Sequence, residues 1–131
     1  MALNVLVVDD SAVMRAMIIK TLGMAAVPVG EVHQAANGQE GLDALKEHWI
    51  DLGIVDINMP VMDGEEMIQR MQADPNVADT PVIVVSTEGS ETRINRLVQI
   101  GAKFIHKPFA PETLRDIIGE ITGVTDSEQP A

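Results

Sequence analysis

Five short apolar runs alternate along the chain with five segments in which apolar residues recur at helical spacing. The runs predict strands over residues 3–8, 27–35, 52–56, 81–86 and 103–106. In the segments between them, apolar residues stand three or four positions apart, which is the period of a helix with one buried face. Because each strand is followed by a helix, this order predicts a parallel sheet flanked by helices.

The predicted strands differ in how apolar they are. Residues 3–8 are continuously apolar and rich in valine, as expected for a strand that is covered on both faces of the sheet. Residues 81–86 are again apolar until the last position. Residues 27–35 are less hydrophobic, which favours a place at the edge of the sheet.

Each predicted helix starts at a residue type that commonly begins helices: Ser11, Asn37, Asp63, Ser90 and Pro111. Serine, asparagine and aspartate side chains accept hydrogen bonds from the free N–H groups of a helix end, and proline suits the first turn. Asn37 and Asp63 are each followed three residues later by a glutamate, which is the spacing of a capping box. The helices are therefore expected to begin at these positions.

The apolar positions within the helical segments predict which side chains face the sheet. The expected inward residues include Met14, Met17, Ile18, Leu22, Leu42, Leu45, Trp49, Met67, Ile68, Met71, Ile94, Leu97, Val98, Leu114 and Ile118. The eight methionines are interpreted as core filler rather than as a ligand-binding face. The three histidines lack the spacing of metal ligands, so they are assigned surface or packing roles.

Length and composition limit the possible classes of protein. The 131 residues suffice for one hydrophobic core, so residues 1–122 are expected to form one domain and residues 123–131 a polar tail. The absence of cysteine excludes disulfides and thiolate metal sites. No apolar run approaches the roughly 20 residues of a membrane span, and no signal peptide is recognisable. A soluble, cytoplasmic protein is expected.

The charge is strongly negative and unevenly distributed. A formal net charge of −11 at pH 7 disfavours binding to nucleic acid or to an anionic membrane. Residues 1–87 carry four basic and thirteen acidic side chains, whereas residues 88–122 carry five of each. The neutral region is a candidate docking face, although ordinary solvated helix charges would give the same pattern.

Polar residues follow four of the predicted strands at the point where each strand ends. Asp9 and Asp10 follow the first strand, Asp56 ends the third, Ser86 ends the fourth and Lys107 follows the fifth. In an open α/β sheet, ligands bind outside the carboxyl ends of the strands. These five side chains are therefore expected to converge on one rim.

This set of residue types predicts phosphoryl transfer assisted by a metal. Carboxylates gathered at one place repel one another, and Mg²⁺, or alternatively Mn²⁺, relieves that repulsion with oxygen ligands. A lysine and a serine hydroxyl suit the oxygens of a phosphoryl group that is transferred to a carboxylate. Spacing alone does not settle which aspartate attacks. The adjacent Asp9 and Asp10 are better placed to hold metal, which leaves Asp56 as the nucleophile.

Five short motifs stand at the ends of the predicted strands. They are residues 7–11 (VVDDS), 56–60 (DINMP), 63–64 (DG), Ser86 and residues 107–109 (KPF). Together they resemble the receiver domain of two-component response regulators, over residues 3–122, and are most similar to chemotaxis CheY-like proteins. The resemblance implies a three-layer, flavodoxin-like (βα)5 fold of the α/β class, with a parallel five-stranded sheet of order 2-1-3-4-5.

The resemblance implies roles for the acidic residues. Asp56 would accept a phosphoryl group from the phosphohistidine of a histidine kinase. Asp10, Asp56 and the backbone carbonyl of Asn58 would bind Mg²⁺, and Asp9 would act on the metal mainly through water. Self-phosphorylation and self-dephosphorylation that depend on Mg²⁺ are expected on the same grounds.

The resemblance also implies how phosphorylation is sensed. Ser86 and Lys107 would contact the phosphoryl group, and Phe104 stands at the position of the switch aromatic. The bond between Lys107 and Pro108 is expected to be cis, which would direct the lysine inward. A phosphoryl group adds roughly two negative charges, which would attract the Ser86 hydroxyl and vacate space that Phe104 can enter.

Four positions bear on access to the phosphoryl group and on the switch. Thr87 stands where many members of the family have alanine or glycine, and its larger side chain could hinder access. Asn58 and Glu88 match the polar pair of chemotaxis members that lose their phosphate quickly, which acts in the opposite direction. Phe104 replaces the commoner tyrosine, so no hydroxyl is available for a hydrogen bond when the ring is buried.

The predicted function is a phosphorylation-dependent signalling switch in chemotaxis or motility control. The expected phosphodonor is a CheA-like histidine kinase or a phosphotransfer domain. The expected target is a protein such as a flagellar motor switch component, docking near residues 90–121. The protein is expected to be a monomer with no nucleic acid or membrane partner.

Three other functions fit parts of the pattern. A phosphorelay carrier or phosphate sink would share the same fold and site, and the chain could be the receiver fragment of a larger regulator. A haloacid-dehalogenase-like phosphatase also uses an aspartate with Mg²⁺. That family needs an Asp-x-Asp motif after the first strand, which the adjacent Asp9 and Asp10 do not provide.

Overall fold

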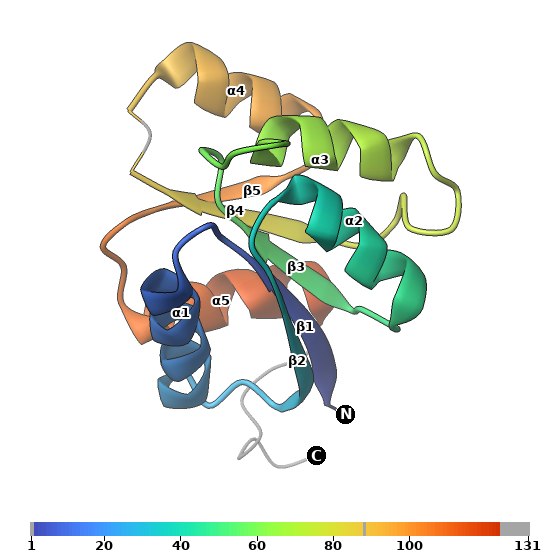
Figure 1. Cartoon of the computed structure of the whole chain (residues 1–131). Coiled ribbons are helices and arrows are strands. Elements are labelled where there is room, and N and C mark those ends of the chain that lie inside the picture. The colour runs from blue at the N-terminus through green and yellow to red at the C-terminus, as the bar shows by residue number, and fades with distance from the viewer. Residues whose placement is uncertain (1, 88, 124–131) are drawn as a thin grey trace.

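The computed structural model describes residues 2–87 and 89–123 and contains the five expected strands. They are β1 (Leu3–Val8), β2 (Val29–Ala35), β3 (Leu52–Val55), β4 (Val82–Ser86) and β5 (Lys103–His106). All neighbours pair in parallel, and the order β2-β1-β3-β4-β5 is the predicted one. The less hydrophobic strand, β2, lies at an edge of the sheet (Figure 1).

Two strands begin later than the sequence pattern predicted, and in both cases a proline stands directly before the first strand residue. β2 follows Pro28 and β4 follows Pro81. Proline has no N–H to donate to a neighbouring strand, so regular pairing starts at the next residue. Apolar character alone therefore placed the start of these two strands too early.

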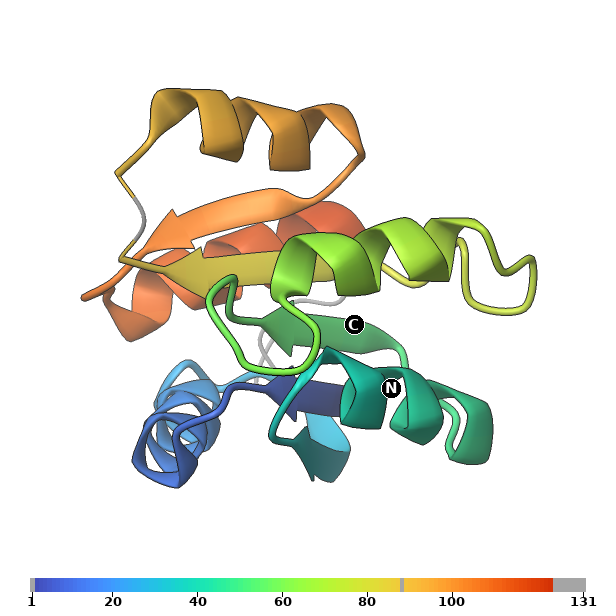
Figure 2. The same ribbon diagram turned by 45° about the horizontal axis from the view of Figure 1, so that its top comes forward.

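Five helices cover the two faces of the sheet. They are α1 (Ala12–Met24), α2 (Gly38–Glu47), α3 (Gly64–Gln72), α4 (Glu91–Gln99) and α5 (Pro111–Thr122). α1 and α5 pack on one face, and α2, α3 and α4 lie over the other (Figures 1 and 2). No helix in the described residues is long and apolar enough to cross a membrane, and the longest, α1, has 13 residues.

The predicted capping residues are confirmed at the helix starts. The side chains of Ser11, Asn37, Asp63 and Ser90 each accept a hydrogen bond from the backbone N–H three residues later. The predicted capping box before α2 forms in altered form, because Oε1 of Glu40 accepts a hydrogen bond at 3.1 Å from the backbone N–H of Ala36, one residue before the N-cap Asn37. Pro111 occupies the first turn of α5, as expected.

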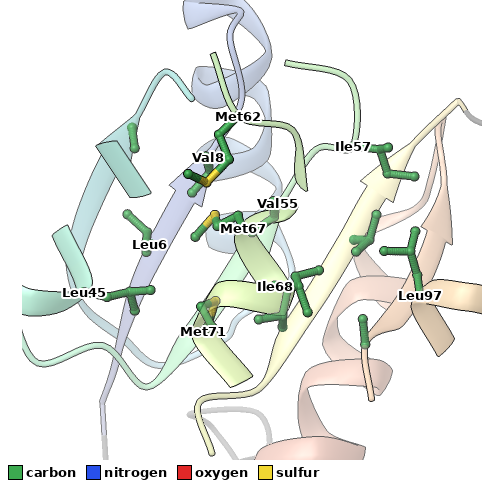
Figure 3. Close-up of a cluster of buried hydrophobic side chains, with 14 of the residues drawn as sticks. Leu6, Val8, Leu45, Val55, Ile57, Met62, Met67, Ile68, Met71 and Leu97 are labelled. Carbon is green, nitrogen blue, oxygen red and sulfur yellow. The ribbon is translucent and has the colours of Figure 1, made fainter. Parts of the chain in front are cut away.

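The sheet separates two hydrophobic clusters. Leu6 and Val8 of β1 belong to the cluster under α2, α3 and α4, whereas Val5 and Val7 belong to the cluster under α1 and α5. This division follows from the alternation of side chains along a strand. Figure 3 shows the first cluster, which contains Met62, Met67 and Met71, so these three methionines are core filler as predicted. For Met17 and Met24 the same prediction is wrong, because both are exposed on α1.

Three residues predicted to face inward are exposed. Trp49 is 78% exposed because α2 ends at Glu47, so the helical spacing no longer applies at that position. Met17 is 56% exposed on α1, a helix with apolar residues on every side that buries only Ile18 and Leu22 fully. Val98 is 52% exposed. It directly follows Leu97, the buried residue of α4, and successive residues of a helix point about 100° apart, so Val98 faces away from the buried side.

Candidate functional site

Backbone hydrogen bonds extend the sheet by one residue at the carboxyl ends of its strands. The N–H of Asp9 donates to the carbonyl of Ala35 at 3.1 Å, and that of Asp56 donates to Val8 at 2.9 Å. On the other side of the sheet, the N–H of Lys107 donates to the carbonyl of Ser86 at 3.0 Å. Residues from four separate strands are thereby brought to a common rim, as the sequence predicted.

The three carboxylates form a compact cluster at this rim. One carboxylate oxygen from each of Asp9, Asp10 and Asp56 lies within 4.8 Å of the others. Asp9 is buried, Asp56 is partly buried and Asp10 is exposed, so the cluster opens to solvent on one side. An all-oxygen, anionic set with an open side fits a hard divalent cation that keeps several waters, as Mg²⁺ does.

Lys107 provides positive charge inside the cluster. Its Nζ lies 3.3 Å from Oδ2 of Asp9 and 3.8 Å from Oδ1 of Asp56, and its side chain is 13% exposed. The peptide bond between Lys107 and Pro108 is cis. Arg15, which was not among the predicted site residues, also contacts the site: its guanidinium donates to the backbone carbonyl of Asp9 at 2.6 Å.

The loop between β3 and α3 approaches Asp56 closely. The N–H of Gly64 donates to the carbonyl of Ile57 at 2.9 Å, and a Cβ on Gly64 would collide with the carbonyl oxygen of Asp56. The N–H of Met62 donates to the carbonyl of Pro60 at 2.7 Å, which closes a three-residue γ-turn. Its central residue, Val61, has a φ of 68°. A glycine at position 64 is therefore required by contact with the backbone of the site.

The comparisons with known proteins agree with this geometry. The sequence pattern of the response regulator receiver domain matches residues 5–119. The chain belongs to the response regulator receiver domain family. It is 34% identical to a chemotaxis protein CheY homolog of Campylobacter jejuni, over 98% of this chain and 99% of that protein. It is 37% identical to chemotaxis protein CheY of Bacillus subtilis, over 92% of this chain and 98% of that protein.

A solved structure supports the same assignment. Chemotaxis protein CheY4 of Vibrio cholerae is 34% identical and superposes with a TM-score of 0.80, over 92% of this chain and 99% of that one. The chain is thus a CheY-like receiver domain of two-component signalling, with a flavodoxin-like fold. Receiver domains generally bind Mg²⁺, and the acidic cluster of this one could hold such an ion.

The expected switch residues of the receiver domain lie on neighbouring strands. Ser86 ends β4 and is buried, and Phe104 on the adjacent β5 is partly buried against the cluster under α4. The Phe104 ring meets His106 edge to face, with the ring centroids 4.7 Å apart. Phe104 thus packs beside the strand that carries Ser86.

Two of the three residues expected to control access to the phosphoryl group lie among the described residues. Thr87 and Asn58 are both exposed. Oδ1 of Asn58 accepts a hydrogen bond from Nη1 of Arg93 at 3.0 Å, a contact between α4 and the loop after β3 that the sequence analysis did not anticipate. Glu88 and the tail from residue 124 onwards lie outside the described residues.

An apolar groove of about 310 Å³ runs from the site along α1. Its lining residues are Met14, Met17, Ile18, Thr21, Thr87, Lys107, Pro108 and Phe109. Val13 and Met24 add further exposed apolar surface to the same helix. The receiver domain therefore presents apolar side chains to solvent directly beside Lys107 and the acidic cluster.

Burial and neighbouring charges determine how Asp56 ionises. Burial raises the pKa of its carboxyl above the ordinary value, and the charges of Asp9 and Asp10 raise it further. The charge of Lys107 and a hydrogen bond from the N–H of Ile57 lower this pKa, but the net direction is upward. Ionisation of Asp56 is thus less favourable than that of an aspartate in water.

We expect this raised pKa to make Asp56→Asn stabilising in metal-free buffer. A carboxyl whose pKa is higher in the folded state adds stability below its unfolded pKa and loses that contribution as the pH rises through the folded pKa. The free energy of unfolding of the variant should therefore exceed that of the wild type by an amount that grows as the pH rises from the unfolded pKa of Asp56 through its folded pKa. Equilibrium urea unfolding of both proteins in a chelator, at several pH values, measures it. A difference that does not change with pH would contradict the expectation.

Proposed function

We propose that the protein is a signalling switch that accepts a phosphoryl group on Asp56 from the phosphohistidine of a histidine kinase. The supporting observation is the position of the Asp56 carboxylate between two other carboxylates and the Lys107 ammonium group. In the reaction, an oxygen of Asp56 attacks the phosphorus, and the N–P bond of the phosphohistidine breaks. The imidazole leaves with the electron pair of that bond and then takes up a proton.

Mg²⁺ would be held by the carboxylates of Asp10 and Asp56 and by the backbone carbonyl of Asn58, with Asp9 acting mainly through water. When bound, the ion supplies positive charge that stabilises the phosphoryl oxygens during transfer. Mn²⁺ has the same preference for oxygen ligands and could substitute. The carboxylates by themselves repel an incoming phosphoryl group, so the chain alone would be a poor acceptor.

Lys107 and Ser86 would recognise the transferred group. Lys107 already lies between Asp9 and Asp56, so its ammonium group can donate to a phosphoryl oxygen on Asp56 with a small movement. The hydroxyl of Ser86 would donate to another oxygen. Because Ser86 and Phe104 are on paired strands, a shift of the serine toward the phosphate would open space for the ring. The surface formed by residues 90–121 would then bind its target more tightly.

The phosphodonor would approach along α1. A donor has to place its phosphorus next to Asp56, and the apolar groove is lined at one point by Lys107, whose Nζ lies 3.8 Å from Oδ1 of Asp56. Exposed apolar surface of this kind is typical of protein contact sites. Transfer would thus use α1, whereas the downstream target would use residues 90–121.

The proposal also includes the setting of the protein. The switch would act in the cytoplasm, in chemotaxis or motility control, and the receiver domain would end at residue 122.

Incubation of the wild-type chain with acetyl phosphate tests the proposed function. We expect Mg²⁺-dependent incorporation of one phosphoryl group, detected by intact mass spectrometry. Hydroxylamine should remove the group, because it cleaves acyl phosphates, and a chelator should prevent its incorporation. A protein that stays unmodified under these conditions, or a modification that resists hydroxylamine, would count against an aspartyl phosphate.

Met17→Glu is expected to reduce phosphotransfer from the cognate phosphorylated kinase by about tenfold, because one charge in the groove removes a contact worth about 1.4 kcal/mol. Phosphorylation by acetyl phosphate should be unchanged, since that donor needs no docking surface. Val98→Glu is the matched control, because Val98 is similarly exposed but lies on α4. Equal losses of kinase transfer in both variants would argue against docking on α1.

A further inference from the structure

Arg93 on α4 bridges two side chains of the loop that follows Asp56. Its Nη1 donates to Oδ1 of Asn58 at 3.0 Å, and its Nη2 lies 3.8 Å from Oδ2 of Asp63. The Arg93 side chain is 24% exposed, which is low for an arginine on a helix at the surface. The other oxygen of Asp63 caps α3 by accepting the N–H of Glu66 at 2.9 Å. The guanidinium therefore contacts a loop whose far end is already held in place.

A second arginine of α4 makes a separate contact with α3. Arg96 stands one turn after Arg93, and its Nε and Nη2 donate to the two carboxylate oxygens of Glu65 at 3.0 and 3.1 Å. Among the described residues, this pair contacts neither Asn58 nor any member of the acidic cluster. α4 thus carries two similar arginine contacts. Arg93 binds Asn58, two positions after Asp56, whereas Arg96 binds Glu65 on α3.

The structure assigns to Arg93 the role of a positioning residue that slows the loss of the phosphoryl group from Asp56. This inference rests on the proposed function of Asp56. The guanidinium has only N–H donors, so the atom of Asn58 that it binds must be the amide oxygen. The bond from Arg93 takes one of the two lone pairs of that oxygen and holds the amide toward α4.

Hydrolysis of an aspartyl phosphate needs an acceptor for the attacking water. The water oxygen forms a bond to phosphorus, and the bond between phosphorus and the Asp56 oxygen breaks. The carboxylate leaves with the electron pair, and the protons of the water pass to phosphate and solvent, giving free Asp56 and inorganic phosphate. An acceptor that orients the water and receives its hydrogen bond speeds such a step. Asn58 is exposed two residues after Asp56 and offers such an acceptor, which the bond from Arg93 holds toward α4 and makes less available to the water.

The decay of the phosphorylated protein tests this role. Wild type and Arg93→Ala are loaded with acetyl phosphate and Mg²⁺, the donor is removed, and the remaining phosphoprotein is followed over time. We expect Arg93→Ala to lose its phosphate about 2- to 10-fold faster, the range that one net hydrogen bond accounts for. Arg96→Ala, the matched control, should decay at the wild-type rate because it frees Glu65 and not Asn58. An unchanged or slower decay in Arg93→Ala would overturn the role.

A double-mutant cycle separates action through Asn58 from a general effect of charge or of helix packing. If Arg93 acts through Asn58, Arg93→Ala should have no effect on the decay rate in the Asn58→Ala background. An acceleration that persists in that background would overturn the inference, as would an equal acceleration in Arg96→Ala. Absence of any phosphoryl group on the wild type would overturn the proposed function and this role with it. Labelled wild type with an unchanged decay rate in Arg93→Ala would overturn only the role of Arg93.

Discussion

Asp56→Asn is expected to carry no phosphoryl group after incubation with acetyl phosphate or with a phosphorylated kinase. The amide of asparagine has nearly the same size and shape as the carboxylate but lacks the charge and the nucleophilic oxygen. Because Asp56 sits within the acidic cluster, the substitution should leave the fold intact. We expect a reduction in labelling of at least about 100-fold, which corresponds to a barrier increase of about 2.7 kcal/mol.

The matched control for this variant is Asp43→Asn. Asp43 lies on the exposed side of α2, where its carboxylate accepts a hydrogen bond from Gln39 at 3.1 Å. The same change of charge there should leave labelling at the wild-type level. A hydroxylamine-sensitive phosphoryl group on Asp56→Asn would show that another carboxylate, such as Asp9 or Asp10, is the acceptor. In that case the acidic cluster would still be the site of phosphorylation, but the nucleophile would be an aspartate other than Asp56.

Asp10→Ala is expected to weaken Mg²⁺ binding by about 100-fold. Two opposite unit charges about 4 Å apart interact by about 4 kcal/mol at an effective dielectric constant of 20, so losing one anion from a divalent site is costly. Since Asp10 is exposed, the change should cost little folding stability. Isothermal titration calorimetry with Mg²⁺, in protein stripped by a chelator, measures the affinity. Retention of wild-type affinity would mean that Asp10 is not a ligand.

The rim of polar residues was predictable because it follows from rules that act on short stretches of sequence. A strand ends where its apolar run ends, and parallel strands bring their carboxyl ends to one edge of the sheet. Asp9, Asp56 and Lys107 therefore met as expected, although nearly 100 residues separate the first from the last. The strand order was implied by the motifs rather than by the apolar pattern.

The contacts that the sequence analysis missed depend on how helices pack against one another. The pairing of Arg93 with Asn58 joins residues 35 positions apart, and no local rule relates a helix arginine to a particular loop amide. The exposure of Met17 was also missed because it depends on which side of α1 packs against the sheet. On a helix with apolar residues all round, spacing does not reveal which side meets the sheet. The neutral charge of residues 88–122 was recognised, but not that two of its arginines bind α3 and the loop after β3.

The position of Trp49 has a practical consequence for optical experiments on this chain. It is the single tryptophan, and there is no tyrosine, so it dominates the intrinsic fluorescence. Trp49 precedes β3, whereas Asp56 follows it, so the indole lies at the opposite end of the sheet from the acidic cluster. Emission should therefore remain nearly constant when a cation or a phosphoryl group is added. Because the ring is already largely in water, its signal should also change little on unfolding, and far-ultraviolet circular dichroism is the better probe.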